Sequence, residues 1–462
     1  MPIASVNPAT GEIVQTFEAL DAAGIERRLA RAEAAFHGYR STPFAARAEL
    51  MHRAADLLDR EQEAVARTMT EEMGKPLAAA RAEAAKCAKA MRWYADHAEA
   101  LLADEHPDPA DVADSGAARA YVRYRPLGPV LAVMPWNFPF WQVIRFAAPA
   151  LMAGNVGLLK HASNVPRTAL AIEELFRRAG FPEGCFQTLL IGSGAVEGVI
   201  RDRRVVAVTL TGSEPAGRAV AATAADEVKK AVLELGGSDP FVVLPSADLA
   251  AAVATAVRAR VQNNGQSCIA AKRFIVHTDV YDRFTADFTE AMRGLRIGDP
   301  MDEATDVGPL ASRQGRDDLE ELVEDARSHG ARVECGGNRP MGWDTGYFYE
   351  PTVLTGVTPA MRIHQEETFG PVATVYRVAD LDEAVALAND TPFGLSSNVW
   401  TTVPDEQERF VRDVQAGGVF FNGMTASHPA LPFGGVKRSG FGRELSGHGI
   451  REFCNVTTVW IG

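Results

Sequence analysis

One cysteine of this sequence lies where a thiol could react. Cys268 stands in the segment VQNNGQSCIAAKRF, after a helical pattern and before a strand-like one. Gly265 and Ser267 beside it leave space for a substrate to approach. A thiol in such a loop is a candidate nucleophile that would form a covalent intermediate. A free cysteine is more commonly buried and inert, so this segment alone leaves both interpretations open.

A carboxylate interrupts an apolar run before this cysteine. Glu234 lies in VLELGGSDP, just ahead of two glycines. A buried carboxylate costs free energy unless it is paired or functional, and burial raises its pKa. Glu234 is therefore a candidate general base, with an ordinary ion pair as the alternative.

A side-chain amide follows another apolar strand, in MPWNFPFWQVIRF. Asn137 stands between that strand and an expected helix, where it could cap the helix or donate to a developing oxyanion. The helical repeat places Trp141 and Arg145 roughly on one face with Asn137. An arginine in an otherwise apolar helix needs a partner, which is either a structural ion pair or an anionic ligand.

Two glycine-rich turns are candidates for binding a phosphate. TGSEPAG follows the apolar strand VVAVTL and opens a helix, so the backbone at Gly212 and the Ser213 hydroxyl could hold a pyrophosphate. An ordinary turn with Ser213 as the helix cap is the alternative. IGSGAVEG is a weaker match, because the spacing of its third glycine differs from that of a dinucleotide fingerprint.

Strands and helices must alternate to position these residues. Near-continuous apolar strands with helices between them predict a parallel α/β sheet covered on both faces. The expected strands are 156–160, 186–191 and 205–210, and the expected helices are 166–179, 195–201, 214–227 and 248–263. Two helices, separated at 74–76, are expected between residues 47 and 105. A second α/β unit is expected from about residue 237.

Composition limits the class of protein. A chain of 462 residues predicts two or three domains. The five cysteines lie far apart and form no Cys/His cluster, which argues against a metal site and a disulfide framework. A net charge of −13 disfavours binding to nucleic acid or to an anionic membrane. No secretory signal or membrane span is expected, and the cytoplasm is the expected location.

Together these segments resemble one family. The ordered set is PWNFP, LLKHAS, TGS, LELGG, GQSC, EETFGPV and PFGGVKRSGFGRE. It resembles the aldehyde dehydrogenase superfamily along the whole chain. The stretches around Asn137 and Cys268 look most like the bacterial NADP-preferring succinic semialdehyde dehydrogenases. The separations of Asn137 from Lys160 and of Glu234 from Cys268 also match the family.

The resemblance implies a fold and an assembly. The fold is α/β of the aldehyde dehydrogenase type, with a Rossmann-type cofactor domain, an α/β catalytic domain and a small oligomerisation sheet. The cofactor domain is expected at 1–112 and 127–236, the catalytic domain at 237–440, and the oligomerisation segments at 113–126 and 441–462. A homodimer or homotetramer is expected.

The resemblance also implies a mechanism. Cys268 attacks the aldehyde, the Asn137 amide and the Cys268 backbone N–H hold the oxyanion, hydride leaves to the nicotinamide, and Glu234 activates the water that hydrolyses the thioester. No metal ion is expected. The expected cofactor-binding residues are Trp136, Asn137, Lys160, His161, Ala162, Ser163, Gly212, Ser213, Leu235, Glu367 and Phe369.

One departure from the family pattern indicates the cofactor. The NAD-specific pattern commonly has a glutamate three residues after the lysine, whereas this sequence has Ser163. A carboxylate would repel a 2′-phosphate, while a hydroxyl can donate to it, and Lys160 with His161 would add positive charge. NADP is therefore expected, with NAD at lower preference. The alternative is that Ser163 only caps the helix that follows.

The subgroup resemblance implies a substrate that bears a carboxylate. Succinic semialdehyde needs a cation at the far end of its pocket, and Arg145 is the expected one, with Trp141, Thr425 and Ser427 as further substrate-binding residues. Glutarate semialdehyde, longer by one methylene, is an alternative substrate.

Other classes of activity are also compatible with parts of the sequence. A CoA-acylating dehydrogenase would use the same cysteine but needs no water-activating base such as Glu234. A non-catalytic family member would not need Cys268, Asn137 and Glu234 together. A cysteine hydrolase would need a histidine partner, and none lies near Cys268 in the sequence.

Overall fold

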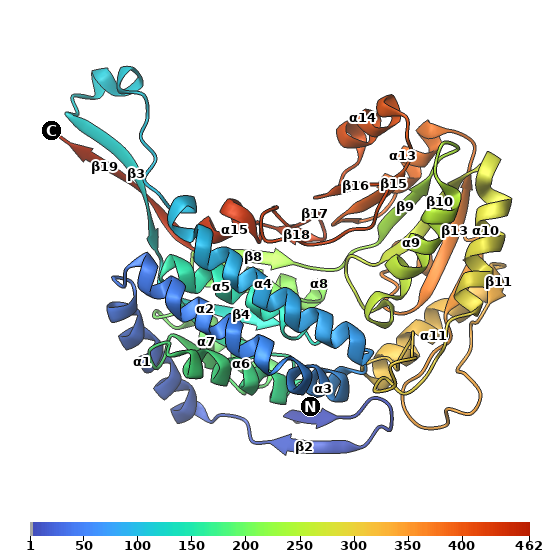
Figure 1. The fold of residues 1–462 in the computed structure, drawn as a ribbon, viewed down its shortest axis with the longest axis horizontal. Coiled ribbons are helices and arrows are strands. Elements are labelled where there is room, and N and C mark those ends of the chain that lie inside the picture. Colours follow the sequence, from blue (N-terminus) through green and yellow to red (C-terminus); the bar gives the residue numbers. More distant parts are fainter. Residues whose placement is uncertain (1–2) are drawn as a thin grey trace.

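Two β-sheets with helices around them form the centre of the molecule (Figure 1). The computed structural model describes residues 3 to 462. The chain leaves the first sheet after Glu234 and enters the second at Asp239. Strands and helices alternate through both halves, which confirms the expected α/β class.

The six-stranded sheet carries the first group of site residues. Its order is β18 (Gly440–Phe441), β8 (Lys230–Glu234), β7 (Ala207–Thr211), β4 (Pro129–Met134), β5 (Val156–His161) and β6 (Phe186–Thr188). All neighbours are parallel except β18 and β8. β4 and β5 are almost wholly buried, as is usual for parallel strands of a sheet that helices cover on both faces. Because parallel strands end at one edge, the residues that follow β4, β5, β7 and β8 lie along one rim.

The seven-stranded sheet begins next to the cysteine loop. Its order is β11 (Arg332–Cys335), β12 (Thr352–Thr355), β13 (Val372–Val378), β10 (Ala271–His277), β9 (Asp239–Val243), β15 (Ser397–Trp400) and β16 (Val419–Phe421). Only β11 and β12 pair antiparallel. Phe274 on β10 pairs with Phe241 on β9, and their rings pack in the buried core of this half. β10 therefore fixes the end of the loop that carries Cys268.

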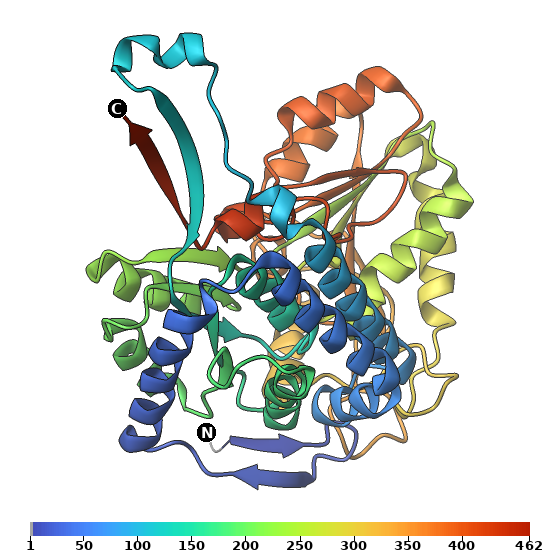
Figure 2. The ribbon, with the colours of Figure 1, turned by 60° about the vertical axis from the view of Figure 1, so that its left-hand side comes forward.

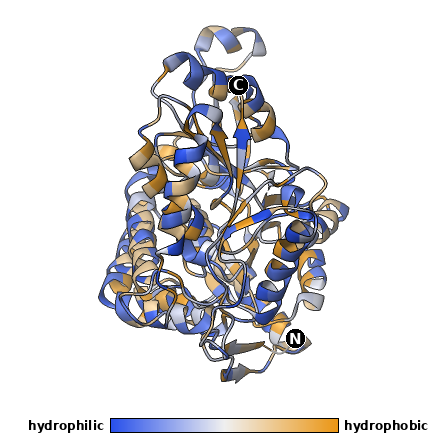
Figure 3. Cartoon of the chain, turned by 90° about the vertical axis from the view of Figure 1, so that its right-hand side faces the viewer, coloured by the Kyte–Doolittle hydropathy of each residue, from blue (hydrophilic) through white to orange (hydrophobic). Residues whose placement is uncertain are grey.

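Helices cover both sheets. Those of the first half are α1 (Ala22–Tyr39), α2 (Phe44–Arg60), α3 (Gln62–Met73), α4 (Leu77–Leu101), α5 (Trp141–Ala153), α6 (Pro166–Ala179), α7 (Val196–Arg201) and α8 (Glu214–Asp226). The later ones are α9 (Leu249–Val261), α10 (Thr278–Arg293), α11 (Arg313–Ser328), α12 (Arg362–Gln365), α13 (Leu381–Asn389), α14 (Pro404–Asp413) and α15 (Ser446–Arg451). The outer helices mix hydrophilic and hydrophobic residues in Figure 3, as amphipathic helices over a core do.

The helical region before residue 105 differs from its prediction. The break at 74–76 is present, and Gly74 there has φ 79°. A Cβ at Gly74 would lie 2.8 Å from the Pro309 carbonyl oxygen, so both its conformation and its space require glycine. A second break at Glu61, which separates α2 from α3, was not predicted because neither proline nor glycine marks it.

A two-stranded ribbon projects from the body. β3 (Arg119–Pro126) and β19 (Cys454–Ile461) pair antiparallel along their whole length. Figures 1 and 2 show this ribbon standing clear of both sheets, with the C-terminus at its end. Two smaller antiparallel pairs are β1 (Ile3–Val6) with β2 (Ile13–Phe17), and β14 (Phe393–Gly394) with β17 (Val436–Lys437). Within residues 3–462, no helix is long and apolar enough to cross a membrane.

Candidate active site

The loop that carries Cys268 is held by two buried asparagines. α9 ends at Val261, and Asn263 and Asn264 then adopt left-handed conformations with φ 55° and 58°. Asparagine tolerates this region better than most residues. The Asn264 amide donates to the carbonyls of Gly74 and Pro309, at 2.9 Å each, and accepts from Gly308 at 2.8 Å. The loop is therefore anchored to segments of the chain on both sides of it.

Cys268 is half-buried in this loop. Burial raises the pKa of its thiol to about 12, while nearby Lys272 and Arg145 act in the opposite direction. Lys272 donates to the Cys268 carbonyl at 2.7 Å, which fixes the backbone of the nucleophile. In the protein alone the thiol is therefore mostly protonated at neutral pH. All five cysteines, which lie in the described part of the chain, are free.

Asn137 lies in the turn between β4 and α5, where the sequence placed it. Its Nδ2 donates to the Gln266 carbonyl at 3.1 Å, and its own carbonyl accepts from Asn263 at 2.8 Å. These bonds connect Asn137 directly to the cysteine loop. Asn137 and Cys268 line the same cavity, so the amide can serve a group bound at the sulfur.

Glu234, at the end of β8, is buried with both carboxylate oxygens unpartnered among residues 3–462. Burial raises the pKa of its carboxyl well above the usual range, and the neighbouring Glu444 adds to this. Leu235 and Gly236, the residues that follow Glu234, line the cavity with Cys268, and the charge of Glu234 raises the pKa of the Cys268 thiol. A Cβ at Gly434 would lie 2.8 Å from one Glu234 oxygen, so glycine makes room for this carboxylate.

Arg145 is buried on α5 and forms an ion pair with Glu444. It also donates to Thr211 at 3.3 Å, and its guanidinium lies 4.7 Å from the Phe433 ring centroid. The structural ion pair, which the sequence left open, is therefore present. No pattern near Arg145 in the sequence identifies Glu444 as its partner.

The main cavity beside Cys268 has a volume of about 280 Å³. Its walls combine the ends of the six-stranded sheet with the cysteine loop and the segment after α12. They are Pro135, Trp136, Asn137, Thr211, Gly212, Ser213, Leu235, Gly236, Cys268, Glu367 and Phe369. Seven of the residues that the sequence assigned to cofactor binding are among them.

The α8 end of this cavity fits a phosphate group. Ser213 is the N-cap of α8, but its side chain makes no capping hydrogen bond, so the hydroxyl stays available. Gly217 lets α8 approach the sheet, because a Cβ there would lie 2.5 Å from the Leu235 side chain. At the opposite end Glu367 accepts from the Gly237 N–H at 3.1 Å, and the Phe369 and Trp136 rings pack edge to face.

Lys160 and His161, the last two residues of β5, and the residues that follow them lie outside that set of wall residues. Lys160 is buried, and burial lowers the pKa of its ammonium. His161 is buried too: its ring contacts the Pro139 carbonyl at 2.9 Å, and burial lowers its pKa to about 4. His161 is thus neutral at physiological pH, and the expected positive charge is absent. Ser163 does not cap α6, whose N-cap is Val165.

A second cavity, of about 230 Å³, contains both predicted residues of the loop after β16. Thr425, Ser427 and Phe433 line it, and the Arg145 guanidinium lies against the Phe433 ring. Lys86 on α4 reaches Ser427, donating to its hydroxyl at 2.7 Å, and lies 4.1 Å from the Trp141 ring centroid. Sequence reasoning missed Lys86, although it sits between the buried positions of a helix.

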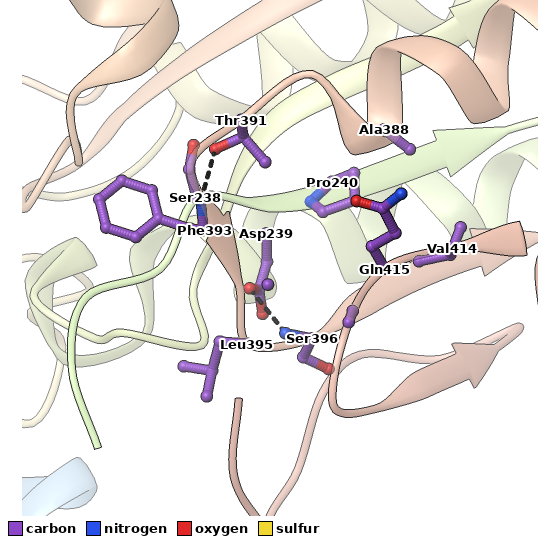
Figure 4. A pocket seen from close by; sticks show the side chains of 12 residues that line it. Ser238, Asp239, Pro240, Ala388, Thr391, Phe393, Leu395, Ser396, Val414 and Gln415 are labelled. Atoms are coloured by element: carbon purple, nitrogen blue, oxygen red, sulfur yellow. Dashed lines mark hydrogen bonds between the residues drawn. The ribbon is translucent and has the colours of Figure 1, made fainter. Parts of the chain in front are cut away.

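A small pocket shares Leu395 and Ser396 with the second cavity, and Figure 4 shows its lining. Asp239 accepts from the Ser396 N–H at 3.0 Å, and the Ser396 hydroxyl contacts that of Thr425 at 2.8 Å. Burial raises the pKa of the Asp239 carboxyl to about 7. The pocket has about 10 Å³ of free volume, which is at most enough for one water. It is therefore a structural element and too small for a substrate.

Comparisons with known proteins agree with this geometry. A model of the aldehyde dehydrogenase family matches residues 1–459. The chain is 63% identical over 463 residues to a succinate-semialdehyde dehydrogenase [NADP(+)] of Mycobacterium avium, covering 100% of this chain and 97% of that protein. It is 62% identical to a protein of that name, numbered 1, in Mycobacterium tuberculosis, with both covered completely.

A solved structure is similar along the whole chain as well. It is a succinic semialdehyde dehydrogenase from Streptococcus pyogenes in complex with NADP+. The TM-score is 0.95, the sequence identity is 36%, and 99% of each chain is covered.

Proposed function

This chain belongs to the aldehyde dehydrogenase family, and we propose that it oxidises succinate semialdehyde to succinate with NADP as the hydride acceptor. The observation that carries the chemistry is the meeting of Cys268 and Asn137 at one cavity, whose wall continues through Leu235, the residue after the buried Glu234. The substrate and cofactor rest on full-length relatives that bear this name. The match covers 97% of the length of one relative and 100% of the other.

In the first half-reaction the Cys268 thiolate attacks the aldehyde carbon and a C–S bond forms. The carbonyl oxygen becomes an oxyanion, which the Asn137 Nδ2 and the Cys268 backbone N–H stabilise. Donors aimed at a developing oxyanion typically contribute about 3 kcal/mol each. NADP would be held by the walls of this cavity and would supply the hydride acceptor. Loss of hydride from the same carbon leaves a thioester on Cys268.

In the second half-reaction Glu234 takes a proton from water, whose oxygen attacks the thioester carbon. The C–S bond breaks, the carboxylic acid leaves, and the Cys268 sulfur is free again. The raised pKa of Glu234 makes it a stronger base than an exposed glutamate, and its two unpartnered oxygens leave space for the water to bind. This role for Glu234 favours hydrolysis over transfer of the acyl group to CoA.

NADP fits the chemistry of the residues at the end of β5 and just after it. Lys160 offers an ammonium that forms no ion pair with any carboxylate of residues 3–462. Ser163 replaces the family's glutamate and is not used as a helix cap. A phosphate on the adenosine ribose would accept from both groups. NAD lacks that phosphate, so we expect it to bind more weakly.

For the substrate carboxylate, Arg145 offers N–H groups beyond those bound to Glu444 and Thr211, since a guanidinium carries five donors. Thr425 and Ser427 offer hydroxyls at the second cavity, and Trp141 an apolar wall. Glutarate semialdehyde presents the same two functional groups, and one methylene discriminates weakly, so we expect slower but measurable turnover of it.

The test measures formation of the reduced cofactor by absorbance, with purified protein, succinate semialdehyde and either NADP or NAD. We expect kcat/KM with NADP to exceed that with NAD by about 10–100-fold, the range of charge-assisted hydrogen bonds. Cys268→Ala should be inactive, and added CoA should not change the rate. A wild-type protein that prefers butanal to succinate semialdehyde would refute the assignment of succinate semialdehyde as the substrate.

The location and assembly belong to the same proposal. Five free cysteines are typical of a reducing compartment, which supports the cytoplasm. The projecting ribbon of β3 and β19 supports a homodimer or homotetramer.

A further inference from the structure

Lys86 occupies an unusual position for a lysine. It lies on α4, where its ammonium donates to the Ser427 hydroxyl at 2.7 Å and lies 4.1 Å from the centroid of the Trp141 ring. Ser427 lines the cavity of about 230 Å³ that adjoins Phe433. A hydroxyl and an aromatic face thus hold this ammonium at the edge of a cavity rather than in bulk water.

The charge of Lys86 has no anionic counterpart in the described chain. Two fully buried lysines, Lys75 and Lys272, form ion pairs with Glu83 and Glu367, whereas Lys86 is half-buried. No carboxylate of residues 3–462 forms an ion pair with Lys86. Burial lowers the pKa of Lys86 to about 8, and the positive charge of Arg145 adds to this effect. An anion at this place would remove that unfavourable free energy.

Arg145 carries the same sign of charge as Lys86, so it does not provide the anionic counterpart. Its positive charge is matched by the negative charge of Glu444, whereas Lys86 leaves one uncompensated positive charge between Trp141 and the cavity. The Lys86 ammonium lies over the Trp141 ring, and Trp141 belongs to the hydrophobic cluster against which Cys268 packs.

We propose that the Lys86 ammonium, together with the Ser427 hydroxyl, binds the carboxylate of the substrate and so selects semialdehydes over uncharged aldehydes. This inference rests on the proposed function and deepens it. The carboxylate accepts one charge-assisted hydrogen bond from Lys86 and a second from Ser427. Lys86 thus adds a second cation to that of Arg145 at the carboxylate end of the site, and its charge is the one without a carboxylate partner.

The experiment compares succinate semialdehyde with butanal, which has the same chain of four carbons without the carboxylate. In Lys86→Met we expect the ratio of the two kcat/KM values to fall by about 10–100-fold, mostly through KM for the semialdehyde, as loss of a charge-assisted hydrogen bond predicts. Lys86→Arg should recover part of the ratio. Lys89→Met, on the exposed face of the same helix, is the matched control and should keep the wild-type ratio.

Three outcomes separate the possibilities. An equal loss with both aldehydes would mean that Lys86 acts on Cys268 or on the fold, and it would overturn the proposal. An unchanged ratio in a folded Lys86→Met protein would also overturn it, while leaving the proposed function intact. A wild-type protein without preference for the semialdehyde would instead refute the proposed function itself. Ser427→Ala gives an independent check, since it should lower the ratio in the same direction without removing a charge.

Discussion

At the scale of single residues, the Cys268 thiol and the Glu234 carboxyl must each lose a proton to react. Their buried surroundings favour the protonated forms. Burial raises the pKa of the Cys268 thiol to about 12 and also raises that of Glu234. Each negative charge further disfavours the other. The structure therefore suits a sequence of two steps, in which the thiolate reacts first and Glu234 acts as base only after the sulfur is acylated and neutral.

Glu234→Gln should separate these steps. The variant keeps the size of the side chain but loses the base, so the first turnover should proceed while hydrolysis of the thioester slows by about 100-fold or more, within the usual range for general bases. Rapid mixing should show a burst of reduced cofactor equal to the concentration of sites, followed by a slow steady state. A variant with no burst would instead assign Glu234 to the first step.

The same residue predicts a pH dependence for the wild-type protein. Glu234 acts when deprotonated, and its pKa is raised by burial and by Glu444. Hydrolysis should therefore weaken as pH falls through this raised pKa, at a higher pH than an ordinary glutamate would require. In Glu234→Gln the slow steady state should lack this dependence, which makes the variant its own control.

At the scale of elements, the strand ends and the cysteine loop act as one frame. Asn264 joins the loop to the turn at Gly74 and to the Gly308–Pro309 segment through three hydrogen bonds. Asn264→Ala would leave several buried backbone groups unpaired, at about 1–3 kcal/mol each. We expect a fall of about 3 kcal/mol in the free energy of unfolding, with a loss of activity, because the backbone of Cys268 depends on the same loop.

Urea denaturation of the variant beside Asn338→Ala checks this expectation. Asn338 is exposed and donates to a carbonyl two residues away, so its removal should be nearly neutral. Equal stability of the two variants would show that the Asn264 contacts do not support the loop.

Local sequence patterns were sufficient to predict helices and strands. They were insufficient to predict which residues far apart in the sequence contact each other. The helix expected at 166–179 is present with those bounds as α6, because its apolar periodicity and its first proline are local signals. Asn137, Glu234 and Cys268 could be found from strand ends and small residues. The contact between Lys86 and Ser427 joins positions 341 residues apart, and no periodicity carries such information. An ion pair of Arg145 was one of two interpretations of the sequence, but its partner Glu444 could not be identified for the same reason.

At the scale of the whole molecule, the ribbon of β3 and β19 is too thin to be stable by itself. Two paired strands in water are marginal, and this pair joins neither large sheet. Val456 and Trp460 on β19 are 61% and 53% exposed, and they lie on one face because side chains alternate along a strand. In the proposed homo-oligomer, a second subunit would cover this apolar face.

Charging this face should therefore dissociate the assembly. We expect the wild-type protein to sediment as a dimer or tetramer, and Trp460→Asp to shift it toward the monomer, since a buried unpaired carboxylate opposes association. Met341→Asp is the matched control, because Met341 is also apolar and 98% exposed but lies on a loop far from the ribbon in the sequence. A Trp460→Asp protein that keeps the wild-type mass in sedimentation velocity would place the subunit contact elsewhere. A monomer that keeps its activity per site would show that each active site is complete within one chain, as the single-chain cavities around Cys268 and Ser427 imply.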